Sequence, residues 1–487
     1  MIHPLGLPEI RARVAAYLDI RDAINCACVS KDWNSTFIEH VWSHISLEVP
    51  SHLPTIQQIQ AHSSHIRTIS LRSVLPDDYY LLDNLHRLHS LQVAHRHGGM
   101  ELNLAFLGKL IENHSSSLEQ FELSGRMSHV PHSIFNALGT CRHLKSIVLH
   151  NLILTLEDLQ VFLINCANIG RRNGGTENRH DNDDDLQRSG HGGLSSLVLD
   201  AVRISRYDSD DVSTLPRLPN LEYLTITESP GMLVNGLTTY FTHCPNVKLF
   251  HWTEAIRLEV ANWVEQIESG MWSDLTFLDF VGQGFGDNEL FRMIENLRLP
   301  LEKLRAESTS FGRDSFKSLI SLERHYTNLR ELNLSGCWDV TSGMIQQIMT
   351  KMPLLESLSA DYLCVTDVLD ASNMDRNSED NGQEWICKNI RTLRLCINLG
   401  GEFDPSSQEY DERQRHVYRR LSNLELIEIL EVGRSFLDRN RRDSVQRMDS
   451  RPNSGLEYLL SLKRLKSFSC DPNEYLTMRD IELRIGE

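Results

Sequence analysis

At 487 residues, with 40% hydrophobic and 24% charged side chains, the chain has the composition of a folded protein and not of a disordered one. Its formal net charge of −17 argues against nucleic acid and anionic membranes as partners, because both repel an acidic surface. The N-terminus lacks a basic stretch followed by an apolar run, so the ten cysteines are expected to be thiols in the cytoplasm or the nucleus.

Residues 1–45 predict a small domain of three short helices. The first helix has an apolar stripe at helical spacing, formed by Ile10, Val14, Tyr17 and Leu18. Pro8 suits its first turn, and Asp22 and Ser30 suit the N-caps of a second helix at 23–28 and of a third helix. Such a domain has a weak core of its own and is usually completed by a partner.

This segment resembles an F-box. The matching positions are Leu7, Pro8, Glu9, Ile10, Val14, Leu18, Asp22, Ala27, Val29, Ser30, Lys31 and Trp33. The resemblance implies docking on the Skp-type adaptor of a cullin-RING (SCF) ubiquitin ligase. The docking residues that it implies are Leu7, Pro8, Ile10, Val29 and Trp33. Ala15 and Ala23 depart from the pattern, since larger apolar residues are common there. The alternative is a bundle that only caps the segment that follows.

After a linker helix at 46–65, one six-residue pattern recurs along the chain, with apolar residues at its first, fourth and sixth positions. Six central copies begin at residues 221, 247, 275, 301, 329 and 355, so the steps between them are 26, 28, 26, 28 and 26 residues. Five further copies precede them at 66, 88, 118, 144 and 194, and three follow at 390, 424 and 465. Roughly ten to fourteen units follow from this count. Such a period is typical of stacked strand-plus-helix units.

Helical stripes and cysteines fill the intervals between these copies. Ile345, Ile348, Met349 and Met352 form one such stripe, and Thr341 suits its N-cap. Cys141 and Cys244 each stand three residues before a copy, where a buried thiol packs as a small apolar group. Residues 66–470 therefore resemble leucine-rich repeats of the cysteine-containing subtype. The resemblance implies an α/β solenoid, a horseshoe with parallel strands on its concave face and helices outside.

The period is interrupted by polar insertions. An acidic, glycine-rich insertion at 170–193 is expected to be disordered. Polar loops are expected at 371–383, 400–416 and 433–454, and residues 471–487 form either a cap or a truncated repeat.

Alternation along each strand sends the residues between the apolar positions to the concave face. Aromatic side chains there are flanked by charges of both signs, a composition that suits protein recognition. The candidate substrate-binding residues are Tyr223, His251, Phe277, Asp279, Lys303 and Arg305.

No catalytic or cofactor motif stands out, and no metal or cofactor is expected. Gly282, Gly284 and Gly286 follow a strand with the spacing G-x-G-x-G, so they lack the glycine at the third position of the dinucleotide fingerprint G-x-G-x-x-G. A repeat turn therefore explains them better than a nucleotide site. His62, His65, His95 and His97 have no ligand set at zinc-like spacing. We therefore interpret the chain as a non-catalytic receptor subunit that binds a protein substrate and, through an Skp-type adaptor, a cullin-RING ligase. A repeat scaffold without a ligase role is the alternative, and a nucleotide-binding enzyme is the rival from another class.

Overall fold

The computed structural model describes most of the chain and divides it into two compact units, Met1–Asn246 and Val247–Glu487. The described residues are 7–48, 53–72, 75–95, 104–127, 130–170, 193–204, 217–227, 244–253, 257–282, 284–364, 385–399, 407–432, 450, 454–471 and 474–486. The predicted insertions at 170–193, 371–383 and 433–454 lie almost wholly outside these residues. None of the helices in the described part is long and apolar enough to cross a membrane.

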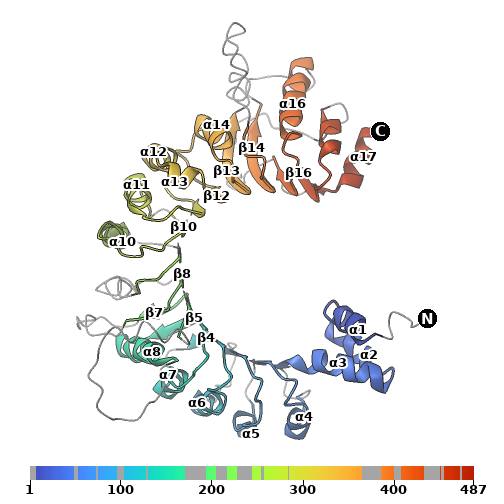
Figure 1. Ribbon diagram of the computed structural model, residues 1–487, viewed down its shortest axis with the longest axis vertical. Coiled ribbons are helices and arrows are strands. Elements are labelled where there is room, and N and C mark those ends of the chain that lie inside the picture. The colour runs from blue at the N-terminus through green and yellow to red at the C-terminus, as the bar shows by residue number, and fades with distance from the viewer. Residues whose placement is uncertain are drawn as a thin grey trace. The chain divides into compact units, whose positions relative to one another are not determined.

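The first unit starts with three helices and continues as strands alternating with helices (Figure 1). The helices are α1 (Pro8–Ala15), α2 (Ile20–Ala27), α3 (Lys31–Ser43), α4 (Ile56–Ala61), α5 (Asp77–Tyr80), α6 (Leu104–Asn113), α7 (His132–Gly139) and α8 (Leu156–Asn168). The strands are β1 (His44–Leu47), β2 (Thr68–Leu71), β3 (Ser90–His95), β4 (Gln120–Met127), β5 (Ser146–Leu154), β6 (Ser196–Asp200), β7 (Arg203–Ile204) and β8 (Tyr223–Thr227). Every strand pairs with its neighbours in parallel.

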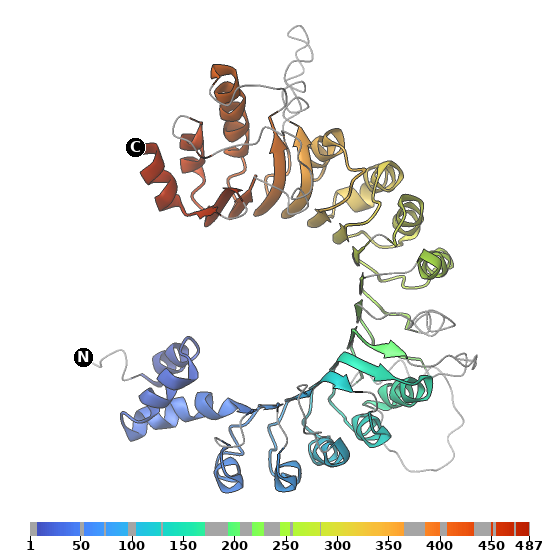
Figure 2. The same cartoon turned by 180° about the vertical axis from the view of Figure 1, so that it is seen from behind.

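The second unit repeats this plan, and Figure 2 shows its helices along one side of its sheet. Its strands are β9 (Leu249–Thr253), β10 (Phe277–Val281), β11 (Lys303–Glu307), β12 (Glu331–Leu334), β13 (Ser357–Cys364), β14 (Thr392–Asn398), β15 (Ile429–Glu431), β16 (Ser467–Asp471) and β17 (Glu474–Leu476). Its helices are α10 (Arg257–Glu268), α11 (Asp287–Asn296), α12 (Arg313–Ser321), α13 (Glu323–Tyr326), α14 (Ser342–Lys351), α16 (Gln408–Leu421), the 3₁₀ helix η6 (Leu456–Ser461) and α17 (Met478–Gly486). The strands pair in parallel up to β16, and β17 runs antiparallel to β16.

The six-residue pattern sets the register of the strands in both units, because its third residue begins a strand in almost every copy. Leu278, Leu304, Leu332 and Leu358, the fourth residues of consecutive copies, are aligned across β10 to β13. All four are fully buried, as are the residues of the predicted stripe on α14. The predicted α/β leucine-rich-repeat solenoid is therefore the fold of the chain.

Three details of the prediction were wrong. The segment 46–65 is not a plain linker helix, because β1 pairs with β2 and α4 follows it as in a repeat. The copy placed at 424 begins at Ile427, since Ile429 pairs with Ser467, the third residue of the next copy. The polar loop at 400–416 contains the start of α16, whose buried residues recur at helical spacing despite its many charges.

Six of the described repeats turn away from the strand through one left-handed residue, seven positions after the copy begins. These residues are Gly125, Asn151, Ala201, Gly282, Ser308 and Gly336, with φ between 53° and 137°. Glycine adopts this conformation at low cost, and asparagine does so more readily than most other residues. The turn therefore explains why glycine recurs at this position, and it leaves strain at Ala201 and Ser308.

Replacing Ala201 with glycine is expected to raise the free energy of unfolding by about 1 kcal/mol, because it relieves a left-handed alanine. The backbone N–H of Ala201 donates to the carbonyl of Thr227 at 2.8 Å, and glycine keeps this hydrogen bond. Urea unfolding of the wild type and the variant measures the change. Ala94→Gly on β3, where φ is not left-handed, is the matched control and should lose stability. A loss in both variants would contradict the strain at Ala201.

Hydrogen bonds between helices of successive repeats couple the units to one another. Asp287, at the start of α11, accepts backbone N–H groups of Gly312, Asp314 and Ser315 at the start of α12, each at 2.9 Å. Burial raises the pKa of the Asp287 carboxyl, but the hydrogen bonds from Ser315, Asp314 and Gly312 outweigh it and lower the pKa overall. One repeat thereby caps the helix of the next.

Buried cysteines and histidines also belong to the core of the repeats. Cys141 and Cys244 are fully buried, and burial raises the pKa of each thiol to about 12, so both pack as small apolar groups as expected. His114 and His325 each lie four residues before a copy of the pattern and are also buried. The Nε2 atom of each bonds a carbonyl of the preceding repeat, Leu82 at 2.9 Å for His114 and Ile294 at 3.1 Å for His325.

Candidate interaction surfaces

The N-terminal helices pack around a small core. Ala15, Ala23, Ala27 and Phe37 are its buried members. The two alanines that depart from the F-box pattern thus lie in the core, where a short side chain lets helices approach closely. Ser30 caps α3, accepting the N–H of Trp33 at 3.2 Å. The N-cap of α2 is Asp19 and not the predicted Asp22, whose N–H donates to Asp19 at 2.8 Å, because the helix starts one turn earlier than predicted.

Several apolar side chains of these helices remain exposed. Among the predicted docking residues, Leu7 is 41% and Val29 65% exposed, and Pro8 at the start of α1 is also on the surface. Ile10 is half-buried, and Trp33 stacks on Phe37 with ring centroids 5.4 Å apart. Leu7, Pro8 and Val29 are thus available to a partner, whereas Ile10 and Trp33 are placed to support them.

Sequence reasoning missed two exposed isoleucines on α2. Ile20 is 51% and Ile24 46% exposed, one turn apart on the helix. They alternate with the buried Ala23 and Ala27, so the signal was an apolar pair facing away from a row of alanines. We call Leu7, Pro8, Ile20, Ile24 and Val29 the exposed apolar set.

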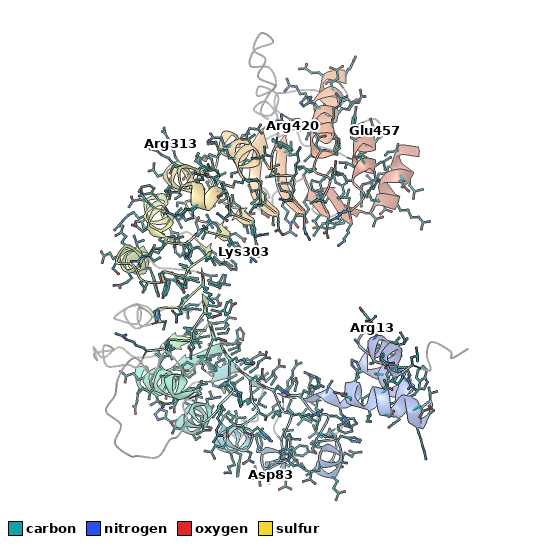
Figure 3. The ribbon with its side chains drawn as sticks, in the orientation of Figure 1. Arg13, Asp83, Lys303, Arg313, Arg420 and Glu457 are labelled. Atoms are coloured by element: carbon teal, nitrogen blue, oxygen red, sulfur yellow. The ribbon has the colours of Figure 1, made fainter. Side chains whose placement is uncertain are left out.

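The second surface lies on the β9 to β12 part of the second unit's sheet. Figure 3 shows Lys303 on the side of this sheet away from the helices and Arg313 on the helix side. His251 Nδ1 lies 2.7 Å from Asp279 Oδ2, and Arg305 lies 3.6 Å from the same carboxylate. Arg305 also pairs with Glu331, from which Lys303 Nζ lies 3.5 Å. Four charged groups and the His251 ring therefore form one chain of contacts across four strands.

Phe277 lies beside these charges. The Lys303 ammonium is 5.2 Å and the Arg305 guanidinium 5.8 Å from the centre of its ring, within reach of a cation–π contact. The structure thus brings together five of the six predicted substrate-binding residues and links them through Glu331. Tyr223, the sixth, is exposed on β8 of the first unit.

The glycines near Gly284 are accounted for by the repeat. Gly282 is the left-handed turn residue of β10, with φ 117°, and Gly286 is the N-cap of α11. Phe285 is buried, its ring 4.4 Å from Phe280 and 5.3 Å from Trp252. In the described part of the chain, no three His, Cys, Asp or Glu side chains are grouped to hold a metal ion.

The chain joins a small helical domain with exposed apolar residues to stacked strand-plus-helix units that present side chains from successive strands. This architecture is typical of proteins that bind other proteins. Residues 5–40 match the F-box domain family. The chain is thus an F-box protein with leucine-rich repeats, whose repeats are evident in its own period and register.

Three solved structures are similar to this chain at low sequence identity. A leucine-rich-repeat protein of Leptospira interrogans is 12% identical, covers 96% of each chain and has a TM-score of 0.39. An internalin from Listeria monocytogenes is 13% identical, covers 85% of this chain and 89% of its own, and has a TM-score of 0.40. A chain of the yeast Rad7 and Elc1 complex is 16% identical, covers 73% of this chain and 87% of its own, and has a TM-score of 0.40. No curated protein matches the chain.

Proposed function

We propose that this chain is the substrate-recognition subunit of an SCF-type (cullin-RING) ubiquitin ligase. In this proposal the F-box binds an Skp-type adaptor, and the repeats bind the protein substrate. The observation that carries it is the exposed apolar set, which lies on the helical domain that matches the F-box family.

The exposed apolar set has a physical reason to bind a partner. Each large apolar side chain removed from water contributes about 1.5–3 kcal/mol. In the free chain these side chains stay exposed to water, because the small core of Ala15, Ala23, Ala27 and Phe37 does not bury them. An adaptor that covers the set therefore supplies apolar burial that the domain itself lacks.

The repeats supply the second half of the proposal. Phe277 with its flanking charges, and separately Tyr223 on the first unit, are the candidate contacts for a protein substrate. Holding a substrate close to a reactive centre on another subunit makes the attack of its lysine effectively intramolecular. The chain then needs no catalytic group of its own.

Binding of the purified full-length chain to an Skp-type adaptor tests the proposal. Leu7→Ala combined with Pro8→Ala is expected to weaken adaptor binding by about tenfold or more, because truncating a buried interface leucine costs at least ~1.4 kcal/mol. Titration calorimetry measures the affinity. Leu81→Ala is the matched control, since Leu81 is a leucine of similar exposure outside the F-box and should leave the affinity unchanged.

The alternative function is a leucine-rich-repeat scaffold without a ligase role. Its helical domain would only cover β1, with which α3 is in contact. If the wild-type chain does not bind the adaptor, or if the F-box variant and the Leu81 control bind equally well, the scaffold becomes the better interpretation.

A further inference from the structure

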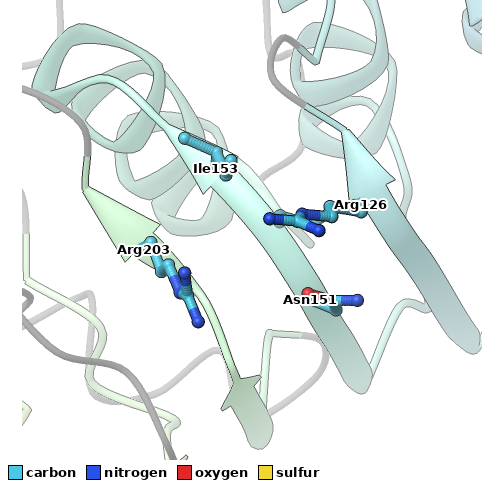
Figure 4. A pocket seen from close by; sticks show the side chains of 5 residues that line it. Arg126, Asn151, Ile153 and Arg203 are labelled. Atoms are coloured by element: carbon cyan, nitrogen blue, oxygen red, sulfur yellow. The ribbon is translucent and has the colours of Figure 1, made fainter.

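The turns of three successive repeats in the first unit form a small cavity that is open to the surface. Arg126, Asn151, Leu152, Ile153 and Arg203 line it. Arg126 follows the left-handed Gly125, Asn151 is itself left-handed with φ 56°, and Arg203 comes two residues after the left-handed Ala201. Figure 4 shows Arg126 and Arg203 on the strands at either side of β5, with Asn151 on β5 itself. The repeat turn thus brings two guanidinium groups and one amide to the same opening.

In the part of the chain that the structure describes, the two arginines are not paired with carboxylates. Elsewhere in the repeats Arg305, Arg330 and Arg394 each pair with a glutamate of the next repeat. Among the residues that the structure describes, neither Arg126 nor Arg203 has an ion pair or a side-chain hydrogen bond. Two unneutralised guanidinium groups at one cavity repel each other and attract an anion. The net charge of the chain is −17, so the positive charge of these two arginines is opposite in sign to that of the chain as a whole.

The size of the cavity restricts the anion. Its volume of about 240 Å³ equals roughly eight water molecules at ~30 Å³ each. Clefts for cofactors and drug-sized ligands usually have about 300–1,000 Å³, so the volume suits one small group with a few waters and not a nucleotide. The planar fork of arginine matches the oxygens of a phosphate group, and the Asn151 amide offers one more donor.

We propose that this cavity binds a phosphate group carried by a phosphorylated side chain of a protein client. The assignment to a client rests on the proposed function, whereas the phosphate chemistry rests on the cavity alone. Leu152, which also lines the cavity, is fully buried, and such an apolar neighbour strengthens charge-assisted hydrogen bonds.

Phosphorus NMR titration of the full-length chain in phosphate-free buffer tests the proposal. The probes are inorganic phosphate and N-acetyl-phosphoserine-N-methylamide, and N-acetyl-serine-N-methylamide is tested as a competitor. Arg126→Gln with Arg203→Gln is expected to weaken binding of both phosphate probes by about 100-fold, at about tenfold for each lost charged hydrogen bond. The control is Arg142→Gln with Arg217→Gln, two exposed arginines of the same unit outside the cavity. This control variant has the same net charge as the cavity variant and should bind both phosphate probes like the wild type.

The outcomes separate the sources of the phosphate group. Tighter binding of the phosphoserine compound than of inorganic phosphate supports a client side chain, and equal affinity overturns that source. The cavity assignment is overturned if neither phosphate probe binds, if the serine compound competes equally, or if the control loses as much affinity as the cavity variant. Adaptor affinity of the cavity variant is measured in parallel. Intact adaptor binding with no phosphate binding overturns this inference alone and leaves the proposed function standing.

Discussion

Replacing Phe250 with alanine is expected to lower the free energy of unfolding of the second unit by about 4 kcal/mol. Phe250 is fully buried on β9, and four aromatic rings surround it, those of Trp252, Trp263, Trp272 and Phe280, with centroids 4.8–5.9 Å away. Alanine would leave a cavity that these rigid rings fill poorly. Urea unfolding followed by tryptophan fluorescence measures the loss, because three of the neighbours are tryptophans.

Tyr475→Ala is the matched control for this prediction. Tyr475 belongs to the same unit but is 60% exposed, so its loss should change stability by no more than about 0.5 kcal/mol. Phe250 also precedes His251, a member of the charged chain on the opposite face of β9. A loss of less than about 1 kcal/mol for Phe250→Ala would contradict the close packing of the aromatic rings.

Acidification is expected to destabilise the second unit through His325. Burial, aided by the nearby Arg324, lowers the pKa of His325 to about 4, although its hydrogen bond to Ile294 opposes the shift. Nδ1 accepts the N–H of Leu301 at 3.1 Å, and Nε2 donates to the carbonyl of Ile294, so the neutral ring satisfies both. Protonation would place a second N–H against the N–H of Leu301.

The direction and the range of this effect follow from proton linkage. The unfolded chain binds a proton at His325 near pH 6.5, and the folded chain only near pH 4. The neutral ring therefore makes its full contribution to the free energy of unfolding above pH 6.5, and this contribution declines as the pH falls toward 4. The loss is about 3 kcal/mol, at ~1.36 kcal/mol for each pKa unit.

Urea unfolding at pH 7 and pH 4.5 measures this loss for the wild type and for His325→Asn. Asparagine does not titrate, so the variant should lose less stability between the two pH values, although it is less stable at pH 7. His143→Asn, at an exposed loop position, should lose as much as the wild type. Equal losses for the wild type and His325→Asn would show that other groups cause the acid sensitivity.

The repeats were predictable because one pattern of three apolar residues fixes strand, register and burial together. Where that pattern overlapped another, prediction failed. Trp42, Ile45 and Leu47 form a copy whose last two residues lie on β1, but Trp42 still belongs to α3. Leu424 and Ile427 both fit as first residues, and only strand pairing distinguishes them. The helix α16 was hidden by its charged residues, although Tyr410, Val417 and Leu421 are buried on one face.

The candidate sites were predictable to a lesser extent, because each depends on how residues from different repeats meet. Alternation along the strands was enough to group His251, Phe277 and Arg305. It did not reveal that Glu331 joins Arg305 and Lys303, since that contact depends on strand register. The cavity between Arg126 and Arg203 was not predicted, because it depends on the left-handed turns that follow the strands.

The charged chain from His251 to Glu331 has a consequence for the kinetics of recognition. Its cations and anions already satisfy one another, so the strands β9 to β12 present a surface close to electrical balance there. Long-range attraction would add little to the rate at which a molecule approaches it. A partner held on this surface would be retained by contact with Phe277, and its dwell time would respond little to added salt.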